Sequence, residues 1–346
     1  MTHSTKSSGL SRRKFLKGTA GAAGAAAVVS TFGIGTARAQ LKQISFITPF
    51  GYLIGFAPIL NAKAGGHFEN AGLDVTVLPG KGSSMAIQQT VADRAQFVRI
   101  SGIDVVKARD KGASLVAVAT IAQSSPFFVV SPSSAAVRKP EDFVGKTIGV
   151  VSVGGGTENL LDVMLADVGI ESSNVRREVV GNGAGAYGLI KAGKIDAYIV
   201  SLGTTVRLRA AGEDILAGNT DDAVKMPGQV YGTMQETIDG DPETVTQFLV
   251  AVNASVKELL SNRDTAFLLD RMLGEFDILG SKDKEFTKKA MREEEALFLS
   301  EGANNVLRNI PARWQSITDG LVKAGIVRPV DAESNYTNAF IDKVLS

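Results

Sequence analysis

Short apolar runs alternate with amphipathic segments along most of the chain. The runs at 44–48, 74–78 and 147–151 are five residues long and rich in Val, Ile and Thr, which is typical of strands buried in a sheet. The segments between such runs, for example 158–168, place apolar residues at helical spacing. This alternation predicts βαβ units and therefore an α/β fold with largely parallel sheets.

The pattern occurs twice, which predicts two lobes. Residues 87–101 and 189–201 each read as a helix, a short polar turn, a strand and a serine. The stretch 131–134, Ser-Pro-Ser-Ser, marks a boundary, and a strand at 230–234 can return the chain to the first lobe. The expected domains are residues 40–131 with 230–346 as lobe 1 and residues 132–229 as lobe 2, each a mostly parallel sheet flanked by helices, with a ligand cleft between them.

Beyond residue 234 the sequence predicts mostly helices. Asp241 and Pro242 form a good helix start, because a capping carboxylate precedes a proline at the first helical position. The segment 284–298 predicts a charged helix, and we interpret its run 292–295, Arg-Glu-Glu-Glu, as a solvated face. Trp314 lies at helical spacing with other apolar residues, so we expect it in the core.

The first 39 residues have the three parts of an export signal. Arg12 and Arg13 precede Lys-Phe-Leu-Lys, an apolar Ala/Gly-rich run covers 18–34, and 37–39 is an A-x-A cleavage site. The arginine pair resembles the twin-arginine signal family. The apolar run is too short and too weakly hydrophobic to span a membrane. We therefore expect residues 1–39 to be a twin-arginine signal peptide and the mature protein to act in the periplasm.

Removal of this leader changes the net charge. It holds six of the 37 basic residues and none of the 36 acidic ones, so the mature chain has 31 basic and 36 acidic residues and a net charge of −5. A nucleic acid or an anionic membrane would need a basic face, so neither is an expected partner. We expect a soluble monomer.

Cysteine is absent and histidine nearly so. Without cysteine the chain has no disulfide and no site for a lipid anchor, which predicts a freely diffusing protein with no membrane anchor. Outside the leader only His67 remains, and we interpret it as an exposed imidazole at a helix end. One histidine and no cysteine make a zinc or iron site implausible, so we expect no metal, no cofactor and no catalytic residues.

In open parallel sheets, ligands bind beyond the carboxyl ends of the strands. This rule selects polar, glycine and aromatic residues that follow the expected strands. In lobe 1 these residues are Phe50, Gly51, Tyr52, Gly82, Ser83, Ser84, Arg99, Ser101, Ser124 and Ser125. In lobe 2 they are Gly154, Gly155, Gly156, Thr157, Asn182, Ser201 and Thr204.

Two of these loops and one arginine have alternative interpretations. Free N–H groups at 82–84 and at 155–157 precede helices and could bind an anion from opposite sides, or the glycines could simply permit tight turns. Arg99 lies in a strand expected to be buried, where a guanidinium needs a partner. That partner is either an anionic ligand or a nearby acid such as Asp93 or Asp104.

Three stretches resemble one family of binding proteins. Residues 66–75 (GHFENAGLDV), 138–150 (RKPEDFVGKTIGV) and 314–340 are similar to segments of periplasmic ABC-transporter solute-binding proteins of the nitrate/sulfonate/taurine and thiamine-pyrimidine-precursor-binding group. His67 stands where that group usually has an aromatic residue. The resemblance implies a type II-like two-lobed fold and a small-molecule ligand such as a sulfonate, carboxylate or heterocycle. It also implies an ABC permease in the inner membrane as partner.

Two other functions stay open at this stage. An exported enzyme on the same fold, similar to pyrimidine synthases, is disfavoured because such enzymes rely on histidine and metal. A ligand-sensing subunit of a signalling system cannot be separated from a transport subunit by sequence. The chain contains no G-x-x-x-x-G-K-[ST] motif, so an importer's ATPase is expected to be a separate chain.

Overall fold

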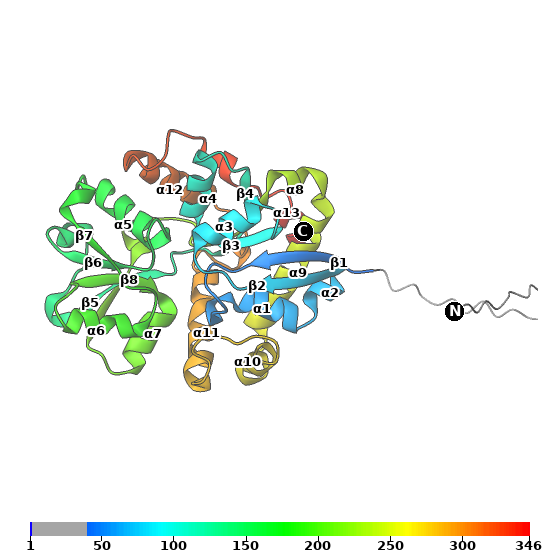
Figure 1. Cartoon of the computed structure of the whole chain (residues 1–346), viewed down its shortest axis with the longest axis horizontal. Coiled ribbons are helices and arrows are strands. Elements are labelled where there is room, and N and C mark those ends of the chain that lie inside the picture. Colours follow the sequence, from blue (N-terminus) through cyan, green and yellow to red (C-terminus); the bar gives the residue numbers. More distant parts are fainter. Residues whose placement is uncertain (2–39) are drawn as a thin grey trace, which may run out of the picture. The chain divides into compact units, whose positions relative to one another are not determined.

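Two five-stranded sheets form the framework of the structure, a computed structural model that describes Met1 and residues 40–346 (Figure 1). The expected twin-arginine signal lies outside the described residues. The first sheet has the order β2-β1-β3-β10-β4. Its strands are β1 (Lys42–Ile47), β2 (Leu73–Leu78), β3 (Phe97–Ile100), β4 (Leu115–Ala122) and β10 (Gln229–Met234). β1 is parallel to β2 and β3, whereas β10 is antiparallel to both of its neighbours.

Alternating side chains in this sheet face two separate cores, as the period of two in a strand requires. Phe97 and Tyr231 lie in one apolar cluster, whereas Val98 and Val230 lie in another. The first cluster is covered by α1 (Ala57–Ala64), α2 (His67–Asn70), α9 (Pro242–Ser261), α10 (Thr265–Leu273), α11 (Lys284–Leu299) and α13 (Ile341–Leu345). The second is covered by α3 (Ser83–Val91), α4 (Gly102–Asp110) and α12 (Pro311–Lys323).

The second sheet has the order β7-β6-β8-β5-β9. Its strands are β5 (Phe127–Pro132), β6 (Thr147–Val150), β7 (Arg176–Val179), β8 (Ala197–Ser201) and β9 (Ile215–Asn219). Its helices are α5 (Gly156–Asp167), α6 (Tyr187–Lys191) and α7 (Leu202–Ala210). β5 is antiparallel to β8 and β9, so this sheet is mixed as the first is. The α/β fold expected from the sequence is confirmed, with one antiparallel strand inside each sheet.

The chain passes between the sheets at 123–126 and again at 220–228. β5 pairs only within the second sheet, so residues 127–131 belong with lobe 2 and not, as the boundary at 131/132 implied, with lobe 1. The Ser-Pro-Ser-Ser punctuation misplaced the boundary because it ends β5 and does not mark the crossing. The expected return strand at 230–234 is β10 of the first sheet.

Two C-terminal helices contact both lobes. α12 packs against α4 and α5, and α11 packs against α7, β4 and the short 3-10 helix η1 (Ile54–Phe56). In Figure 1, α11 runs between the two sheets. Trp314 of α12 is fully buried and stacks on Tyr336 at 5.3 Å, which confirms the expectation for this residue. The remaining helices are α8 (Gln235–Gly240) and short 3-10 turns.

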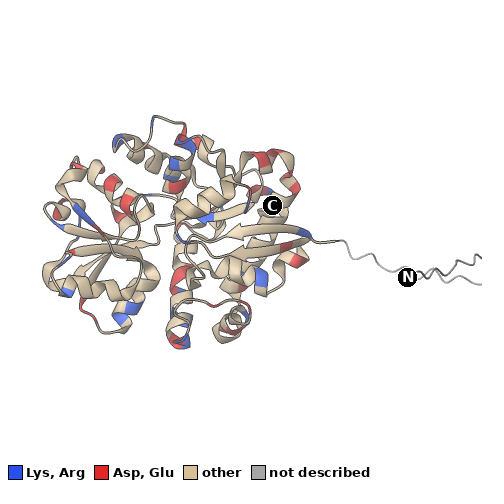
Figure 2. Cartoon of the chain, in the orientation of Figure 1, with Lys and Arg blue, Asp and Glu red and all other residues tan. Residues whose placement is uncertain are grey.

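Two charged sites differ from expectation. The run 292–295 on α11 is not a solvated face, because Glu294 is buried and its three neighbours are half-buried. His67 is not an exposed imidazole at a helix C-terminus, because it is half-buried, begins α2 and has its Nε2 2.7 Å from the Glu258 carboxylate. In both cases helix packing buries residue types that are normally solvated. Elsewhere, acidic and basic residues are interspersed over both lobes (Figure 2).

Glu258 joins the helices that cover the first core. Its Oε2 accepts hydrogen bonds from Arg271 at 2.6 Å and Asn61 at 3.0 Å, in addition to the His67 contact. Burial acts to raise the pKa of Glu258, but these hydrogen bonds outweigh it and lower the pKa to about 2. The ionised carboxylate therefore links α1, α2, α9 and α10.

We expect Glu258→Gln to destabilise the protein at pH 7 by about 1–3 kcal/mol, because buried donors lose a charged acceptor. The folded pKa lies below the ordinary value of 4.5, so the stabilisation is present above pH 4.5 and is lost as the pH falls toward 2. Urea unfolding from pH 7 to pH 3 measures both effects. The control Glu285→Gln changes an exposed carboxylate on α11. If the free energy of unfolding depends on pH in the same way in Glu258→Gln and Glu285→Gln, the role of Glu258 is contradicted.

Candidate ligand-binding cleft

The carboxyl ends of the central strands of the two sheets meet between the lobes. Gly156, the first residue of α5, faces Ser101, which caps α4. A methyl group at Gly156 would lie 3.4 Å from the Ser101 hydroxyl oxygen and 3.7 Å from the Asp104 carboxylate. Close by, Lys107 of α4 donates to Asn159 Oδ1 of α5 at 2.5 Å. The lobes are thus in contact at the edges that the switch-point rule selects.

Ser101 and Asp104 are held together before any ligand is considered. The Ser101 hydroxyl accepts from the Asp104 amide at 3.2 Å and donates to the Asp104 carboxylate at 2.9 Å, which forms a capping box. Burial raises the pKa of Asp104, against the hydrogen bonds from Ser101 and from Ser83. Ser83 begins α3 and is buried, whereas Ser84 next to it is exposed. Ser83, Ser101 and Asp104 thus form one polar group at the edge of lobe 1.

The loop after β1 is shaped by backbone contacts. Gly51 has a φ of +46° and donates from its amide to Gly80 at 2.9 Å, and Phe50 forms an isolated bridge with Lys81. Tyr52 donates its hydroxyl to the Val77 carbonyl at 2.9 Å and packs its ring 5.0 Å from Phe276. The Tyr52 hydroxyl is therefore engaged within lobe 1.

The glycine loop of lobe 2 requires glycine for two different reasons. Gly154 has a φ of +62°, in the left-handed region, and a side chain at Gly155 would collide with Ser152 Oγ at 2.2 Å. Thr157 is buried, and its hydroxyl accepts from the Val151 amide at 2.9 Å. The tight-turn interpretation therefore accounts for Gly154 and Gly155. The glycine loop of lobe 1 differs. Its Gly82 has a φ of +131°, and a Cβ added there would meet open space.

Three other expected residues of lobe 2 lie together. Asn182 donates to the Ser201 hydroxyl at 2.9 Å and accepts from the Ser201 amide at 2.9 Å. The Thr204 hydroxyl donates to the Asn182 carbonyl at 2.5 Å. This arrangement holds the loop after β7 against the start of α7, at the carboxyl end of β8.

Arg99 is buried and has neither of the acidic partners that were considered. Its Nη1 donates to the Gly55 carbonyl at 2.5 Å, and its Nε donates to Gln229 Oε1 at 3.4 Å. The guanidinium lies 4.7 Å from the centre of the Phe56 ring. Asp93 instead accepts from Gln96, and Asp104 binds Ser101. Of the two alternatives for Arg99, pairing with Asp93 or Asp104 is not formed, because both acids bond other residues, and contact with an anionic ligand stays a prediction.

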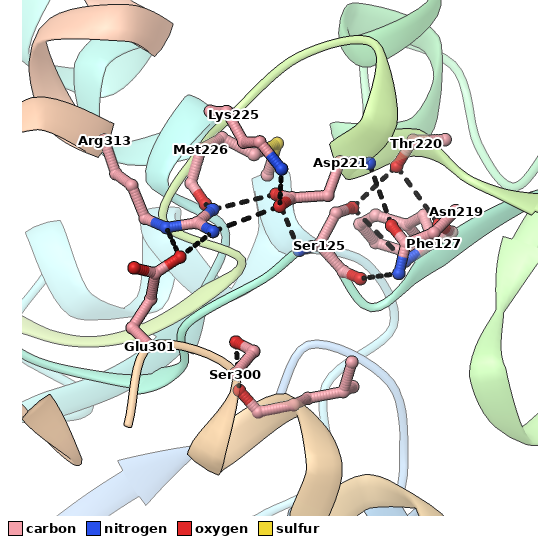
Figure 3. Close-up of polar contacts among 11 residues, drawn as sticks. Ser125, Phe127, Asn219, Thr220, Asp221, Lys225, Met226, Ser300, Glu301 and Arg313 are labelled. Atoms are coloured by element: carbon pink, nitrogen blue, oxygen red, sulfur yellow. Dashed lines mark hydrogen bonds and ion pairs between the residues drawn. The ribbon is translucent and has the colours of Figure 1, made fainter. Parts of the chain in front are cut away.

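Ser124 and Ser125 lie in the first crossing. The Ser125 amide donates to Asp221 Oδ1 at 3.2 Å, and its hydroxyl accepts from Thr220 at 2.7 Å (Figure 3). Ser124 is buried, and its carbonyl lies so close to Gly228 that a side chain there would collide at 1.9 Å. Both serines thus join the two crossings.

Asp221 and Arg313 were missed by sequence reasoning. Arg313 of α12 contacts both Asp221 oxygens, at 2.9 and 3.1 Å, and both side chains are only 7% exposed. Arg313 also donates to the Met226 carbonyl at 2.9 Å and to Glu301 (Figure 3). No sequence motif marks either residue. Asp221 lies in the second crossing, and Arg313 follows it by 92 positions.

Two hollows of about 470 Å³ on the described surface lie away from the contact between Ser101 and Gly156. One lies at the far end of α4 and includes Arg109 and Arg328. The other lies where α10 and α11 begin.

The two lobes, the double crossing and the opposed strand ends define the fold of periplasmic solute-binding proteins. Residues 54–266 match the NMT1/THI5-like family model, which is more than half of the chain. The chain belongs to the NMT1/THI5-like family. No curated protein sequence matches it.

Solved structures share this fold at low sequence identity. A protein of Bordetella bronchiseptica RB50 is 22% identical with a TM-score of 0.70, over 88% of this chain and 97% of that chain. The alkanesulfonate-binding protein SsuA of Xanthomonas axonopodis pv. citri, bound to MOPS, is 16% identical with a TM-score of 0.66, over 86% and 99%. The periplasmic nitrate-binding protein NrtA of Synechocystis PCC 6803 is 12% identical with a TM-score of 0.67, over 88% of both chains.

We expect Arg313→Met to destabilise the protein by about 3–5 kcal/mol, because it leaves Asp221 buried without its main partner. The matched control is Lys225→Met, which removes the other cation near Asp221, at 3.3 Å and 61% exposed. That change is expected to cost no more than about 1 kcal/mol. Urea unfolding of both variants provides the comparison. Similar losses for the two would show that the buried pair contributes no more to stability than the exposed Lys225 contact does.

Proposed function

We propose that this chain is the solute-binding subunit of an ABC importer and not an enzyme. It captures a small organic ligand, a sulfonate, carboxylate or heterocycle, by closing its lobes. The closed form is then recognised by a permease in the inner membrane. Residues 1–39 direct the protein to the periplasm, where it acts as a monomer without a membrane anchor.

The opposition of Gly156 and Ser101 is the observation that carries this proposal. The start of α5 in lobe 2 meets the start of α4 in lobe 1, and the two crossings at 123–126 and 220–228 lie side by side, joined by the Ser125–Asp221 hydrogen bond. Two lobes on a double crossing can separate and close by a hinge motion. Closure on a ligand between the strand ends excludes water and gives the permease a distinct shape to bind.

The ligand contacts proposed for the cleft come from both lobes. Ser83, Ser84 and Ser101 would act from lobe 1, and Gly156 with Asn182 from lobe 2. The amides at the start of α5 favour an acidic group on the ligand, because the positive end of the helix dipole lies there. The related structures support this class of ligand, since one is an alkanesulfonate-binding protein and another a nitrate-binding protein.

No helix among the described residues is long and apolar enough to cross a bilayer.

A panel of small molecules tests the proposed ligand class. The probes are ethanesulfonate, taurine, propanoate, β-alanine, pyrimidine and 4-aminopyrimidine. A ligand at about 100 times its Kd stabilises the folded state by about 2.7 kcal/mol, which raises the melting temperature by several degrees. If none of the six raises the melting temperature of the mature protein or releases heat in calorimetry, the ligand class is wrong.

We expect Gly156→Phe to hold the lobes apart, because a phenyl ring there must occupy the space of Ser101 and Asp104. Small-angle X-ray scattering should show a larger radius of gyration, and any probe that binds should lose at least about tenfold in affinity. Gly188→Phe is the matched control, since Gly188 is exposed on α6 with open space around it. An unchanged radius and affinity in Gly156→Phe would contradict closure at this contact.

A further inference from the structure

Glu294 is a buried carboxylate on the helix that lies between the lobes. It is 7% exposed, and its neighbours one turn away on α11, Met291 and Leu297, belong to the first apolar core. The same core includes Leu202 and Val206 of α7, which come from the second lobe. Glu294 therefore lies on the face of α11 that packs into this shared core.

No other described residue donates a hydrogen bond to Glu294 or forms an ion pair with it within 4.0 Å. Its oxygens are not among the completely enclosed polar atoms that lack a partner, so they retain slight access. Gly55 packs closely against the carboxylate, since a Cβ at Gly55 would lie only 3.0 Å from Oε1. An ionised carboxylate in such surroundings needs a donor.

The nearest cation does not supply that donor. Arg99 is engaged with the Gly55 carbonyl, Gln229 and the Phe56 ring, and it forms no ion pair with Glu294. Burial raises the pKa of the Glu294 carboxyl to about 7, although the charge of Arg99 opposes this shift. A carboxyl whose pKa is raised in this way keeps unused capacity for a hydrogen-bond donor.

This group lies at the carboxyl ends of strands of the first sheet. Gly55 follows the loop after β1, and Arg99 precedes Ser101 by two residues at the end of β3. Gln229 begins β10 directly after the second crossing and pairs with Ala122 at the end of β4. The end of β1, the end of β3 and both crossings thus converge around Glu294 and Arg99.

We propose that Glu294 selects the ligand of the cleft by accepting a hydrogen bond from a nitrogen donor on it. Resting on the proposed function, this inference narrows the ligand to a small molecule with an ammonium, amine or amino-heterocycle N–H group. Such a ligand is preferred over one of the same size that lacks the donor. Arg99 is a buried positive charge near Glu294, which suits an acidic group elsewhere on the same ligand.

The charge state of Glu294 makes this preference depend on pH. The charged groups around it are Arg99 on β3, which faces Tyr231 on β10, and Glu293 on its own helix. η1 and β4, which pack against α11, contain no titratable side chain, whereas α7 carries Arg207 and Arg209, and α10 carries Asp270 and Arg271. As the pH rises through about 7 the carboxyl ionises, so an ammonium ligand should bind more tightly at pH 8 than at pH 6.

The experiment compares three matched pairs of probes on the mature protein by calorimetry. Taurine, β-alanine and 4-aminopyrimidine carry a nitrogen donor, whereas ethanesulfonate, propanoate and pyrimidine do not. We expect a donor-bearing member to bind more tightly than its partner. Glu294→Gln should lower that affinity by at least about tenfold, the loss expected for one hydrogen bond to a charged group. It should also remove the rise in affinity from pH 6 to pH 8.

Glu293→Gln is the control, because it removes the same charge one residue away, where Lys289 lies 4.0 Å from the carboxylate. It should keep the preference for the donor-bearing probe and the rise in affinity with pH, although loss of the Glu293 charge lowers the pKa of Glu294. A measurement without ligand checks the buried carboxyl itself. The folded state keeps its proton up to about pH 7, above the ordinary value of 4.5, so the melting temperature should fall as the pH rises through this window in the wild type and less in Glu294→Gln.

Each outcome decides between the two proposals. If probes bind but the members of each pair bind equally, or if Glu294→Gln binds as the wild type does, the role of Glu294 is overturned and the proposed function stands. If none of the six probes binds, both proposals are overturned. If the melting temperatures of the wild type and Glu294→Gln change equally with pH, Glu294 is not the buried, unpaired acid described above, and its role in selection fails.

Discussion

The buried ion pair between Asp221 and Arg313 connects the parts of the protein that must move together. Asp221 lies in the second crossing and holds the Ser125 amide of the first, while Arg313 belongs to a C-terminal helix that touches both lobes. A buried pair gives little net stability, because desolvation offsets much of the attraction, but losing one partner is costly. Its consequence here is geometric. The pair fixes the second crossing to α12, and the Ser125–Asp221 and Thr220–Ser125 hydrogen bonds hold the two crossings side by side.

The contact between α4 and α5 is built from small and polar groups, beside apolar cores that the two lobes share. Gly156 and Ser101 meet without large side chains, and Lys107 reaches Asn159 across the same boundary. Such a contact buries little apolar area, so it is easier to open than the continuous core beneath α11 and α12. The fold thus combines two crossings that are joined by buried hydrogen bonds with a contact between α4 and α5 that buries little apolar area. That combination suits a protein that opens to admit a ligand and closes around it.

Glu294 and His67 show where reading the chain by local pattern fails. The run Arg-Glu-Glu-Glu has the composition of a solvated helix face, yet α11 packs on η1, β4 and α7 and has little free surface there. His67 was expected to be an exposed imidazole at a helix end, yet α9 brings Glu258 within 2.7 Å of it. Arg99 was correctly predicted to be buried, but its partners are a carbonyl, an amide and a ring and not an acid. Each partner comes from a distant segment, which no local pattern can identify.

The sequence by itself determined the fold class, most strands and helices and the burial of Trp314. These follow from periodicity and from capping residues, such as Asp241 at the start of α9. It also identified the loops at the carboxyl ends of the strands, because the order of elements in a parallel sheet fixes that edge. Only the tertiary structure decided which lobe holds β5, which partners bind Arg99 and Asp221, and that Glu294 is buried. Those outcomes depend on contacts between residues tens to hundreds of positions apart, whose geometry is set by packing.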